Sequence, residues 1–230
     1  MSGPATSLPS ASVEDYLKAI YSLGRAGGRV STTELAERLG FAPSSASAMI
    51  SRLSEAGLLD RVPYAGVILT EEGERQALRV IRRHRLLEAF LVSSLDLPWD
   101  EVHVYAEQLE HAASDELIDV IAAKLGDPSV DPHGDPIPTR ELTIDEGATA
   151  KLAQLPPDER AVLVRVSDSD AELLRHLAEL KIGIGDEVEM VGRQPFDGLF
   201  EVRIAGRTHQ LSLVLAEAIQ VRRRQGAAGE

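Results

Sequence analysis

Apolar side chains recur three or four residues apart in the first quarter of the chain, which is the spacing of helices that bury one face. This pattern predicts three short helices separated by glycine-containing turns. Ser12 with Asp15, and Ser31 with Glu34, are expected to form the capping boxes of the first two helices. Pro43 is expected in the first turn of the third helix, where its missing N–H costs nothing.

Two short aliphatic runs, Leu58–Val62 and Val67–Leu69, flank a turn at Tyr64–Gly66 and predict a β-hairpin. Two helices joined by a tight turn and followed by such a hairpin are typical of a winged helix-turn-helix. A longer helix is predicted from its cap at Thr70 to about Ser94. Its exposed side is expected to be basic, with Arg75, Arg79, Arg82, Arg83 and Arg85.

The rest of the chain changes pattern twice. Helical spacing continues around 101–111 and over Asp115–Leu125, whereas 126–150 lacks periodicity, is rich in proline and glycine, and is predicted to be a linker. The last third carries short apolar runs separated by turn signals, with one helix predicted over Ala171–Leu180, and indicates a small β-barrel. Strands are predicted at Ala161–Val166, Glu187–Val191, Leu199–Ile204 and Ile219–Arg222.

Composition narrows the chemistry that the chain can perform. A hydrophobic content of 43% and a charged content of 27% are those of a globular protein. The net charge of −13 argues against indiscriminate nucleic-acid binding, so any contact with DNA must be local. The absence of cysteine excludes disulfides and zinc–thiolate sites. With no leader and no long apolar run, the sequence predicts a cytoplasmic protein without a membrane segment.

The segment from Glu101 to His111 is rich in groups that bind metals. If it is helical throughout, four of its side chains share one stripe: His103, Glu107, Glu110 and His111. A solvated polar face would explain this stripe equally well. His84 and Glu88 lie one helical turn apart on the long predicted helix and offer a second set of donors, although such a pair is more often a surface contact.

The order of these features resembles the diphtheria toxin repressor family of metal-dependent regulators. The resemblance covers roughly Val13 to Arg222 and includes the winged helix-turn-helix, both ligand segments and the run Asp131-Pro-His-Gly-Asp-Pro-Ile-Pro138. It implies a mainly α fold with a small amount of β structure. The domains expected from it are a winged helix-turn-helix DNA-binding domain (1–73), a helical dimerisation and metal-binding domain (74–140), a linker (141–157) and an SH3-like, FeoA-like β-barrel (158–224).

The resemblance also implies two metal sites. Asp15, Glu107, Glu110 and His111 match ligands of a primary site, and His84, Glu88 and His103 match ligands of an ancillary site, to which Asp168 is a further candidate. Iron-responsive members carry a methionine and a cysteine where this chain has Asp15 and Glu107. Losing sulfur donors removes a preference for softer metals, which favours Mn(II), with Fe(II) or Co(II) also expected to bind in vitro. Lys18 stands where some small manganese regulators have a carboxylate, which favours a primary plus ancillary arrangement.

By the same resemblance, five residues are expected to face DNA: Thr32, Ser44, Ser45, Ser47 and Arg52. Helix capping is an alternative role for the serines. The sequence thus predicts a Mn(II)-activated, homodimeric repressor of metal homeostasis genes, not an enzyme, that binds double-stranded operator DNA with an inverted repeat. The alternatives are an Fe(II)-responsive repressor, a metallohydrolase, or a winged-helix regulator with an organic effector. His133, His176 and His209 are expected to be structural or solvated.

Overall fold

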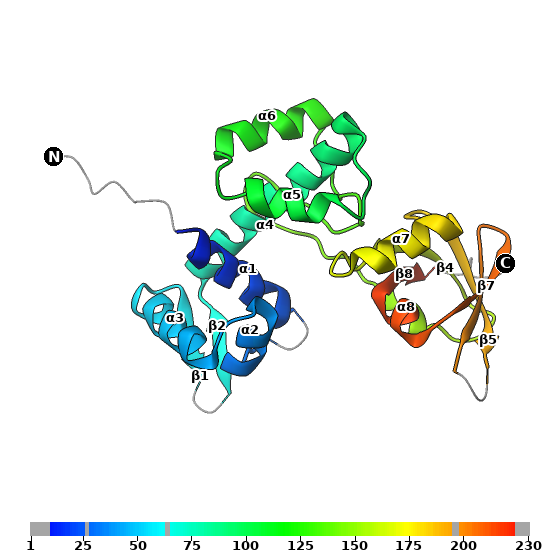
Figure 1. The fold of residues 1–230 in the computed structure, drawn as a ribbon, viewed down its shortest axis with the longest axis horizontal. Helices are drawn as coiled ribbons and strands as arrows, with labels where there is room; N and C mark the ends of the chain where they lie inside the picture. Colours follow the sequence, from blue (N-terminus) through cyan, green and yellow to red (C-terminus); the bar gives the residue numbers. More distant parts are fainter. Residues whose placement is uncertain (1–9, 26–27, 63–64, 195–197, 224–230) are drawn as a thin grey trace, which may run out of the picture. The chain divides into compact units, whose positions relative to one another are not determined.

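The computed structural model describes residues 10–25, 28–62, 65–194 and 198–223 (Figure 1). The chain divides into two compact units. The first comprises 1–84, 109–115 and 138–143, and the second comprises 85–108, 116–137 and 144–230, apart from the residues not described. Tyr64 of the predicted hairpin turn, and most of the two chain ends, lie outside the described residues.

The first unit contains the predicted winged helix-turn-helix, which the structure confirms. Its elements are α1 (Ala11–Gly24), α2 (Thr32–Leu39), α3 (Pro43–Glu55), the antiparallel strands β1 (Leu59–Val62) and β2 (Gly66–Leu69), and the start of α4 (Glu71–Leu95). Leu17, Ile20, Leu35 and Leu53 are almost fully buried, so the apolar faces of α1, α2 and α3 share one core.

Of the predicted starts of α1, α2 and α3, two are confirmed. Ser31 and Glu34 form a reciprocal capping box, and Pro43 occupies the first turn of α3. The predicted box of Ser12 and Asp15 is wrong. The helix already begins at Ala11 after an extended Ser10, so Ser12 lies inside its first turn and Asp15 is left available for another role.

Helix α4 begins as predicted, with the hydroxyl of Thr70 accepting the N–H of Gly73 (3.1 Å). Its basic side is not wholly exposed, however. Arg83 is buried, because carboxylates from other segments pair with it, and the guanidinium groups of Arg82 and Arg85 donate to the carbonyls of Pro138 and Pro136. Within the described residues no helix, α4 included, is long and apolar enough to cross a membrane.

The second unit contains the later part of α4, most of α5 (Val102–Leu109) and most of α6 (Asp115–Leu125). Leu86, Val102, Ile118 and Ala122 are buried. The prediction of a ligand helix extending to His111 is wrong, because α5 ends at Leu109. Glu110 and His111 lie in the turn that follows and therefore cannot continue the stripe of His103.

The stretch 126–149 has no helix or regular strand, as the sequence predicts, but it is not a simple exposed linker. Asp131, His133 and Ile137 are buried. One carboxylate oxygen of Asp131 accepts the backbone N–H groups of His133 (2.8 Å) and Asp135 (2.9 Å), which folds the motif into a tight loop. The carbonyl of His133 accepts the N–H of Val166 (2.9 Å), so the loop is fastened to a strand.

The C-terminal part of the second unit is the predicted small β domain. Six strands form an antiparallel sheet in the order β3-β8-β4-β5-β6-β7, and α7 (Ala171–Leu180) and α8 (Leu213–Ala218) accompany it (Figure 1). The strands are β3 (Ala150–Lys151), β4 (Arg160–Val166), β5 (Glu187–Arg193), β6 (Phe200–Ile204), β7 (Arg207–Leu211) and β8 (Ile219–Arg223). The predicted strands and α7 are confirmed. Strand β7 was not predicted, because it is an edge strand in which only Leu211 is buried.

The loop 131–137 generates a prediction about stability. Gly134 has φ +87°, and a Cβ atom there would lie 2.0 Å from the backbone carbonyl oxygen of Val164. We expect Gly134→Ala to lower the free energy of unfolding by about 3 kcal/mol or more, because the backbone of β4 would have to move. Denaturation followed by the fluorescence of Trp99, the chain's only tryptophan, measures this.

Gly126→Ala is the matched control, because Gly126 has φ +79° but no atom within 4 Å of the added Cβ. Gly126→Ala should therefore lower the free energy of unfolding by only about 1–2 kcal/mol, the cost of a left-handed backbone conformation for alanine. Equal losses for the two variants would show that the close approach to β4 has no energetic weight.

Candidate metal centre

The first group of potential metal ligands lies in the first unit and joins α1 to the turn after α5. It consists of Asp15, Glu110 and His111, whose candidate donor atoms lie within 4.8 Å of one another. His111 Nε2 is 2.9 Å from Asp15 Oδ1 and 3.6 Å from Glu110 Oε1. Two carboxylate oxygens and one imidazole nitrogen therefore converge on one point.

The ring of His111 is held by a residue that the sequence did not indicate. Its Nδ1 donates to Glu14 Oε2 (2.6 Å), which leaves Nε2 directed at Asp15 and Glu110. Imidazoles that ligate metals commonly donate their second N–H to a carboxylate in this way, which fixes the tautomer and the ring orientation. Glu14 escaped prediction because its role depends on a contact with His111, 97 positions away in the sequence, which periodicity within one segment cannot reveal.

A buried ion network supports Glu14 in turn. Arg83 Nη1 donates to Glu14 Oε1 (3.1 Å), and Arg83 Nη2 lies 2.8 Å from Asp115 Oδ1. Glu14 and Arg83 are both buried, and removing either one would leave the charge of the other unpaired away from water. The imidazole of His111 is therefore connected through Glu14 to α4 and to the first residue of α6.

Glu110 is the most deeply buried member of the first group, with no exposed side-chain surface. Its Oε1 accepts from Lys18 Nζ (2.6 Å) and its Oε2 contacts His84 Nδ1 (2.5 Å). Burial opposes the charged carboxylate, but the hydrogen bond from His84 and the charge of Lys18 outweigh it and lower the pKa of Glu110. Both carboxylate oxygens of Glu110 are thus in close contact with nitrogen groups of other residues.

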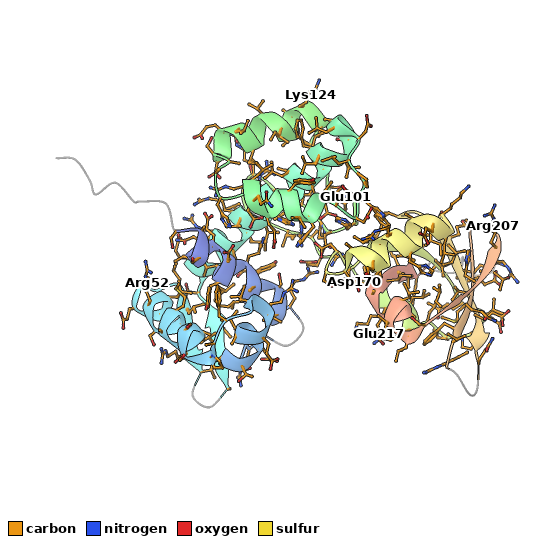
Figure 2. The ribbon with its side chains drawn as sticks, in the orientation of Figure 1. Arg52, Glu101, Lys124, Asp170, Arg207 and Glu217 are labelled. Atoms are coloured by element: carbon orange, nitrogen blue, oxygen red, sulfur yellow. The ribbon has the colours of Figure 1, made fainter. Side chains whose placement is uncertain are left out.

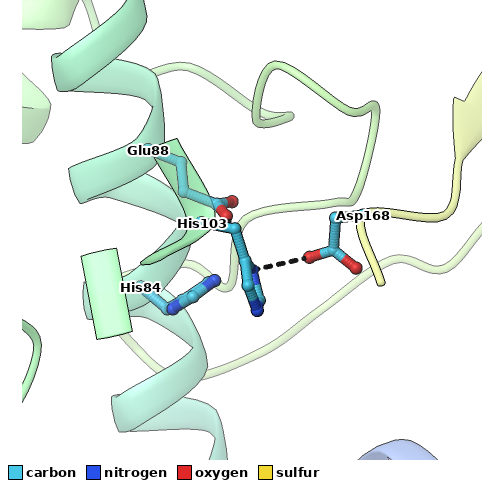
Figure 3. Close-up of side chains that lie close together, drawn as sticks. All are labelled: His84, Glu88, His103 and Asp168. Atoms are coloured by element: carbon cyan, nitrogen blue, oxygen red, sulfur yellow. Dashed lines mark hydrogen bonds and ion pairs between the residues drawn. The ribbon is translucent and has the colours of Figure 1, made fainter. Parts of the chain in front are cut away.

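A second group of potential ligands lies in the second unit. Figure 3 shows the ring of His103, from α5, between Glu88 of α4 and Asp168, which follows β4. His103 Nδ1 is 3.2 Å from both Glu88 Oε1 and Asp168 Oδ2. His84 lies one turn before Glu88 on α4. Asp168 had been indicated only by the resemblance, as a further candidate for the ancillary site.

Glu107 lies beside the second group rather than within either group among the described residues. Its Oε1 is 3.5 Å from His103 Nε2, on the side of the ring away from Glu88 and Asp168. Burial opposes the charged imidazole, but hydrogen bonds to Asp168, Glu107 and Glu88 outweigh it and raise the pKa of His103 to about 12. Three carboxylates, those of Glu88, Glu107 and Asp168, thus surround the imidazole of His103.

His133 contacts the opposite side of Glu88 and has a structural environment. It is fully buried, its Nε2 donates to the carbonyl of Trp99 (2.7 Å), and its ring stacks on Trp99 at 5.8 Å between centroids. Its Nδ1 is 3.7 Å from Glu88 Oε2. Burial lowers the pKa of His133, but Glu88 and Asp131 outweigh it and raise this pKa to about 9.

The donors of both groups fit a hard divalent cation. They are carboxylate oxygens and imidazole nitrogens, as Mn(II) and Fe(II) accept, and the chain has no cysteine to offer thiolate. Removing water from several carboxylates at close range is costly without positive charge among them. The chemistry of the residues therefore agrees with metal binding at both places.

The surface of α3 carries the side chains expected to face DNA. Ser44, Ser45 and Ser47 are exposed, Thr32 of α2 is partly exposed, and Arg52 projects outward from α3 (Figure 2). Capping does not explain the serines, because the residue before α3 is Ala42 and no side chain caps the helix. A short row of hydroxyls and one guanidinium can contact phosphates and base edges.

Comparison with known protein families assigns all three parts of the chain. Residues 10–67 match the iron dependent repressor N-terminal DNA binding domain, and 70–139 match the iron dependent repressor metal binding and dimerisation domain. Residues 150–223 match the FeoA domain. These matches confirm the resemblance drawn from the sequence.

Individual relatives include both iron- and manganese-dependent repressors. The chain is 30% identical over 223 residues to the diphtheria toxin repressor of Corynebacterium glutamicum, covering 93% of this chain and 96% of that one. It is 36% identical over 160 residues to the iron-dependent repressor IdeR of Mycobacterium tuberculosis, covering 66% and 70%. The structure of a manganese-dependent transcriptional repressor in complex with manganese superposes with a TM-score of 0.87 and 41% identity, covering 92% and 100%.

Family membership excludes two of the alternatives that the sequence left open, a metallohydrolase and a regulator with an organic effector. It does not choose between iron and manganese, because relatives of both kinds match. Since the similarity to the Corynebacterium repressor extends over nearly the full length of both proteins, and the DNA-binding and metal-binding domains of the family both match, the chain belongs to the diphtheria toxin repressor family of metal-dependent, DNA-binding transcriptional repressors.

Proposed function

We propose that this protein is a Mn(II)-activated transcriptional repressor that binds operator DNA as a homodimer and controls metal homeostasis genes. The observation that carries the proposal is the first ligand group. Asp15 comes from α1, and Glu110 and His111 come from the turn after α5. A bound divalent cation would neutralise these carboxylates and crosslink the two segments.

Helix α1 is suited to transmit this crosslink to DNA. Its apolar side, with Leu17 and Ile20, is buried in the core that also holds α2 and α3. Its polar side presents Asp15 to the ligand group. Fixing α1 therefore fixes the recognition helix α3 as well, because a packed core moves as one body.

Glu88, His103 and Asp168 are proposed as ligands of a second, ancillary metal, with His84 as a fourth donor from the preceding turn of α4. Asp168 belongs to the region that matches the FeoA domain, and Glu88 and His103 belong to the dimerisation domain match. A metal at this site would tie these two regions together. Glu107 remains a proposed primary ligand on the strength of the resemblance, although its carboxylate contacts His103 here.

The preference for Mn(II) is proposed from the donors. Mn(II) binds most weakly among the first-row divalent ions, so no site of this kind favours it by affinity alone. A ligand set without sulfur withholds the donors that favour softer metals, and the supply of metal in the cytoplasm then decides occupancy. The structural similarity to a manganese-dependent repressor supports this assignment. Fe(II) is the competing ion, since iron-dependent relatives also match.

Homodimerisation is proposed from exposed apolar side chains in the region that matches the dimerisation domain. Val104 and Tyr105 on α5 are 57% and 45% exposed, and Leu117 and Val120 on α6 are 51% and 65% exposed. A symmetric dimer reads two equal half-sites, which requires an inverted repeat in the operator. The net charge of −13 confines the DNA contact to a local surface, for which α3 is the candidate.

The first prediction concerns metal-dependent DNA binding. DNA fragments selected from a random library with Mn²⁺ present should bind about 5- to 150-fold more weakly in chelator, the usual range of coupling between two sites. Asp15→Ala and His111→Ala should bind weakly in both conditions, because each lacks a ligand. Glu101→Gln, an exposed carboxyl near α5, should behave like the wild type. Fluorescence anisotropy measures each affinity, and metal-independent binding by the wild type would contradict the proposal.

A second prediction concerns the ancillary site. Asp168→Asn should weaken binding of one Mn²⁺ per chain at least about tenfold. Removing a residue that only hydrogen-bonds to a metal ligand already lowers metal affinity by about 10- to 100-fold, and loss of a ligand should cost at least as much. Glu179→Gln, which removes a 74%-exposed carboxylate of α7, should leave both affinities unchanged. Calorimetric titration at fixed pH separates the two binding events. The proposal fails if Asp168→Asn retains both events at wild-type affinity.

A third prediction concerns metal choice. Asp15→Met combined with Glu107→Cys introduces a thioether and a thiolate, so the Fe²⁺ concentration needed for half-maximal DNA binding should fall relative to that of Mn²⁺. Asp15→Glu combined with Glu107→Asp keeps oxygen donors and should not move the ratio in that direction. The measurement is anaerobic DNA binding at buffered free metal. An unchanged ratio in the sulfur-containing variant would refute the assignment of these two positions.

A further inference from the structure

The side chain of Lys18 contacts the first ligand group directly. Lys18 lies on α1, one turn after Asp15, and three or four residues is the separation that places side chains on one face of a helix. Its Nζ is 2.6 Å from Glu110 Oε1, and the pair is mostly buried, with 19% and 0% of the two side chains exposed. This is a close ion pair between residues 92 positions apart in sequence.

Lys18 contacts the oxygen of Glu110 that faces the other proposed ligands. Glu110 Oε1 is 3.6 Å from His111 Nε2, which is itself 2.9 Å from Asp15 Oδ1. The other oxygen, Oε2, is turned towards His84. An ammonium group on Oε1 and a divalent cation among Asp15, Glu110 and His111 would repel each other at short range, in surroundings that water screens poorly.

We propose that Lys18 is a tethered counter-cation of this site: its ammonium neutralises Glu110 when no metal is bound, and it must leave Glu110 Oε1 when a divalent cation binds. The inference rests on the proposed function, because it takes Asp15, Glu110 and His111 as the metal ligands. Lys18 has two consequences there. It stabilises the metal-free form, and it weakens metal binding, so the concentration of metal needed for activation is set by a residue that is not a ligand.

The main test is calorimetric titration of the full-length protein with Mn²⁺. Lys18→Met keeps most of the aliphatic side chain and removes the charge, and it should bind Mn²⁺ at the first site about tenfold more tightly, or about 1.4 kcal/mol by the constant relating affinity to free energy. Lys18→Arg keeps a cation and should stay near wild-type affinity. Lys124→Met removes an exposed charge on α6 and should leave the affinity unchanged. Unchanged or weaker binding by Lys18→Met would overturn the proposal.

Thermal unfolding supplies a readout that does not depend on DNA binding. Without metal, Lys18→Met should melt below the wild type, since Glu110 loses a buried partner, and saturating Mn²⁺ should raise its melting temperature more than it raises that of the wild type. An equal rise in the two proteins would count against displacement.

A measurement on the wild type keeps the proposal testable if Lys18→Met does not fold. The chain has four lysines, Lys18, Lys124, Lys151 and Lys181, so the NMR signals of their ¹⁵N-labelled ammonium groups can be distinguished, with Lys18→Arg identifying the signal of Lys18. Saturation with diamagnetic Zn²⁺ should move the Lys18 signal from an ion-paired to a solvated position. A Lys18 signal that does not respond would overturn the proposal.

Asp15→Ala separates this inference from the proposed function. If that variant binds as much Mn²⁺ as the wild type, the ligand assignment itself is wrong and both fall. If it loses one Mn²⁺ per chain while Lys18→Met gains no affinity, the ligands stand and only the role of Lys18 is refuted.

Discussion

A carboxylate removed from water needs positive charge beside it, and Glu110 places this demand at the centre of the first unit. Nitrogen groups from three segments contact this carboxylate. Lys18 comes from α1, His84 from α4 and His111 from the turn that contains Glu110 itself. Glu110 therefore belongs both to the contacts that hold these segments together and to the first group of potential ligands. A change in the positive charge near Glu110 acts on the packing of the segments and on the metal site at once.

Helix α1 packs on one side and carries polar residues at the first group of potential ligands on the other. Its apolar side belongs to the core with α2 and α3, and its polar side carries Glu14, Asp15 and Lys18. Glu14 is paired with Arg83 and His111, so the orientation of a proposed ligand depends on a buried ion pair with α4. The core that holds the apolar side of α1 also holds α3.

The sequence was sufficient for the fold, and it named most of the residues that the structure brings together in the two groups of potential ligands. Periodicity located the helices and most strands, and the resemblance supplied Asp15, His84, Glu88, His103, Glu110 and His111. It failed where one helix was extended too far. Leu109 ends α5, so Glu110 and His111 do not share a stripe with His103, and Glu107 lies beside His103. Glu14, and the pairing of Lys18 with Glu110, depend on contacts between distant segments, which periodicity within one segment cannot reveal.

The proline-rich motif at 131–138 lies in the segment that the sequence predicted to be a linker. A segment without periodicity is expected to be an exposed linker, but this one is buried and supports the second ligand group from both sides. The ring of His133 lies 3.7 Å from Glu88, and its carbonyl accepts the N–H of Val166, two residues before Asp168. One residue thus contacts the helix that presents Glu88 and the strand that leads to Asp168. Gly134 allows this close approach because β4 leaves no room for a side chain there. The irregular backbone is therefore packed between the helix that carries Glu88 and the strand that precedes Asp168, and its prolines limit the conformations that it can adopt.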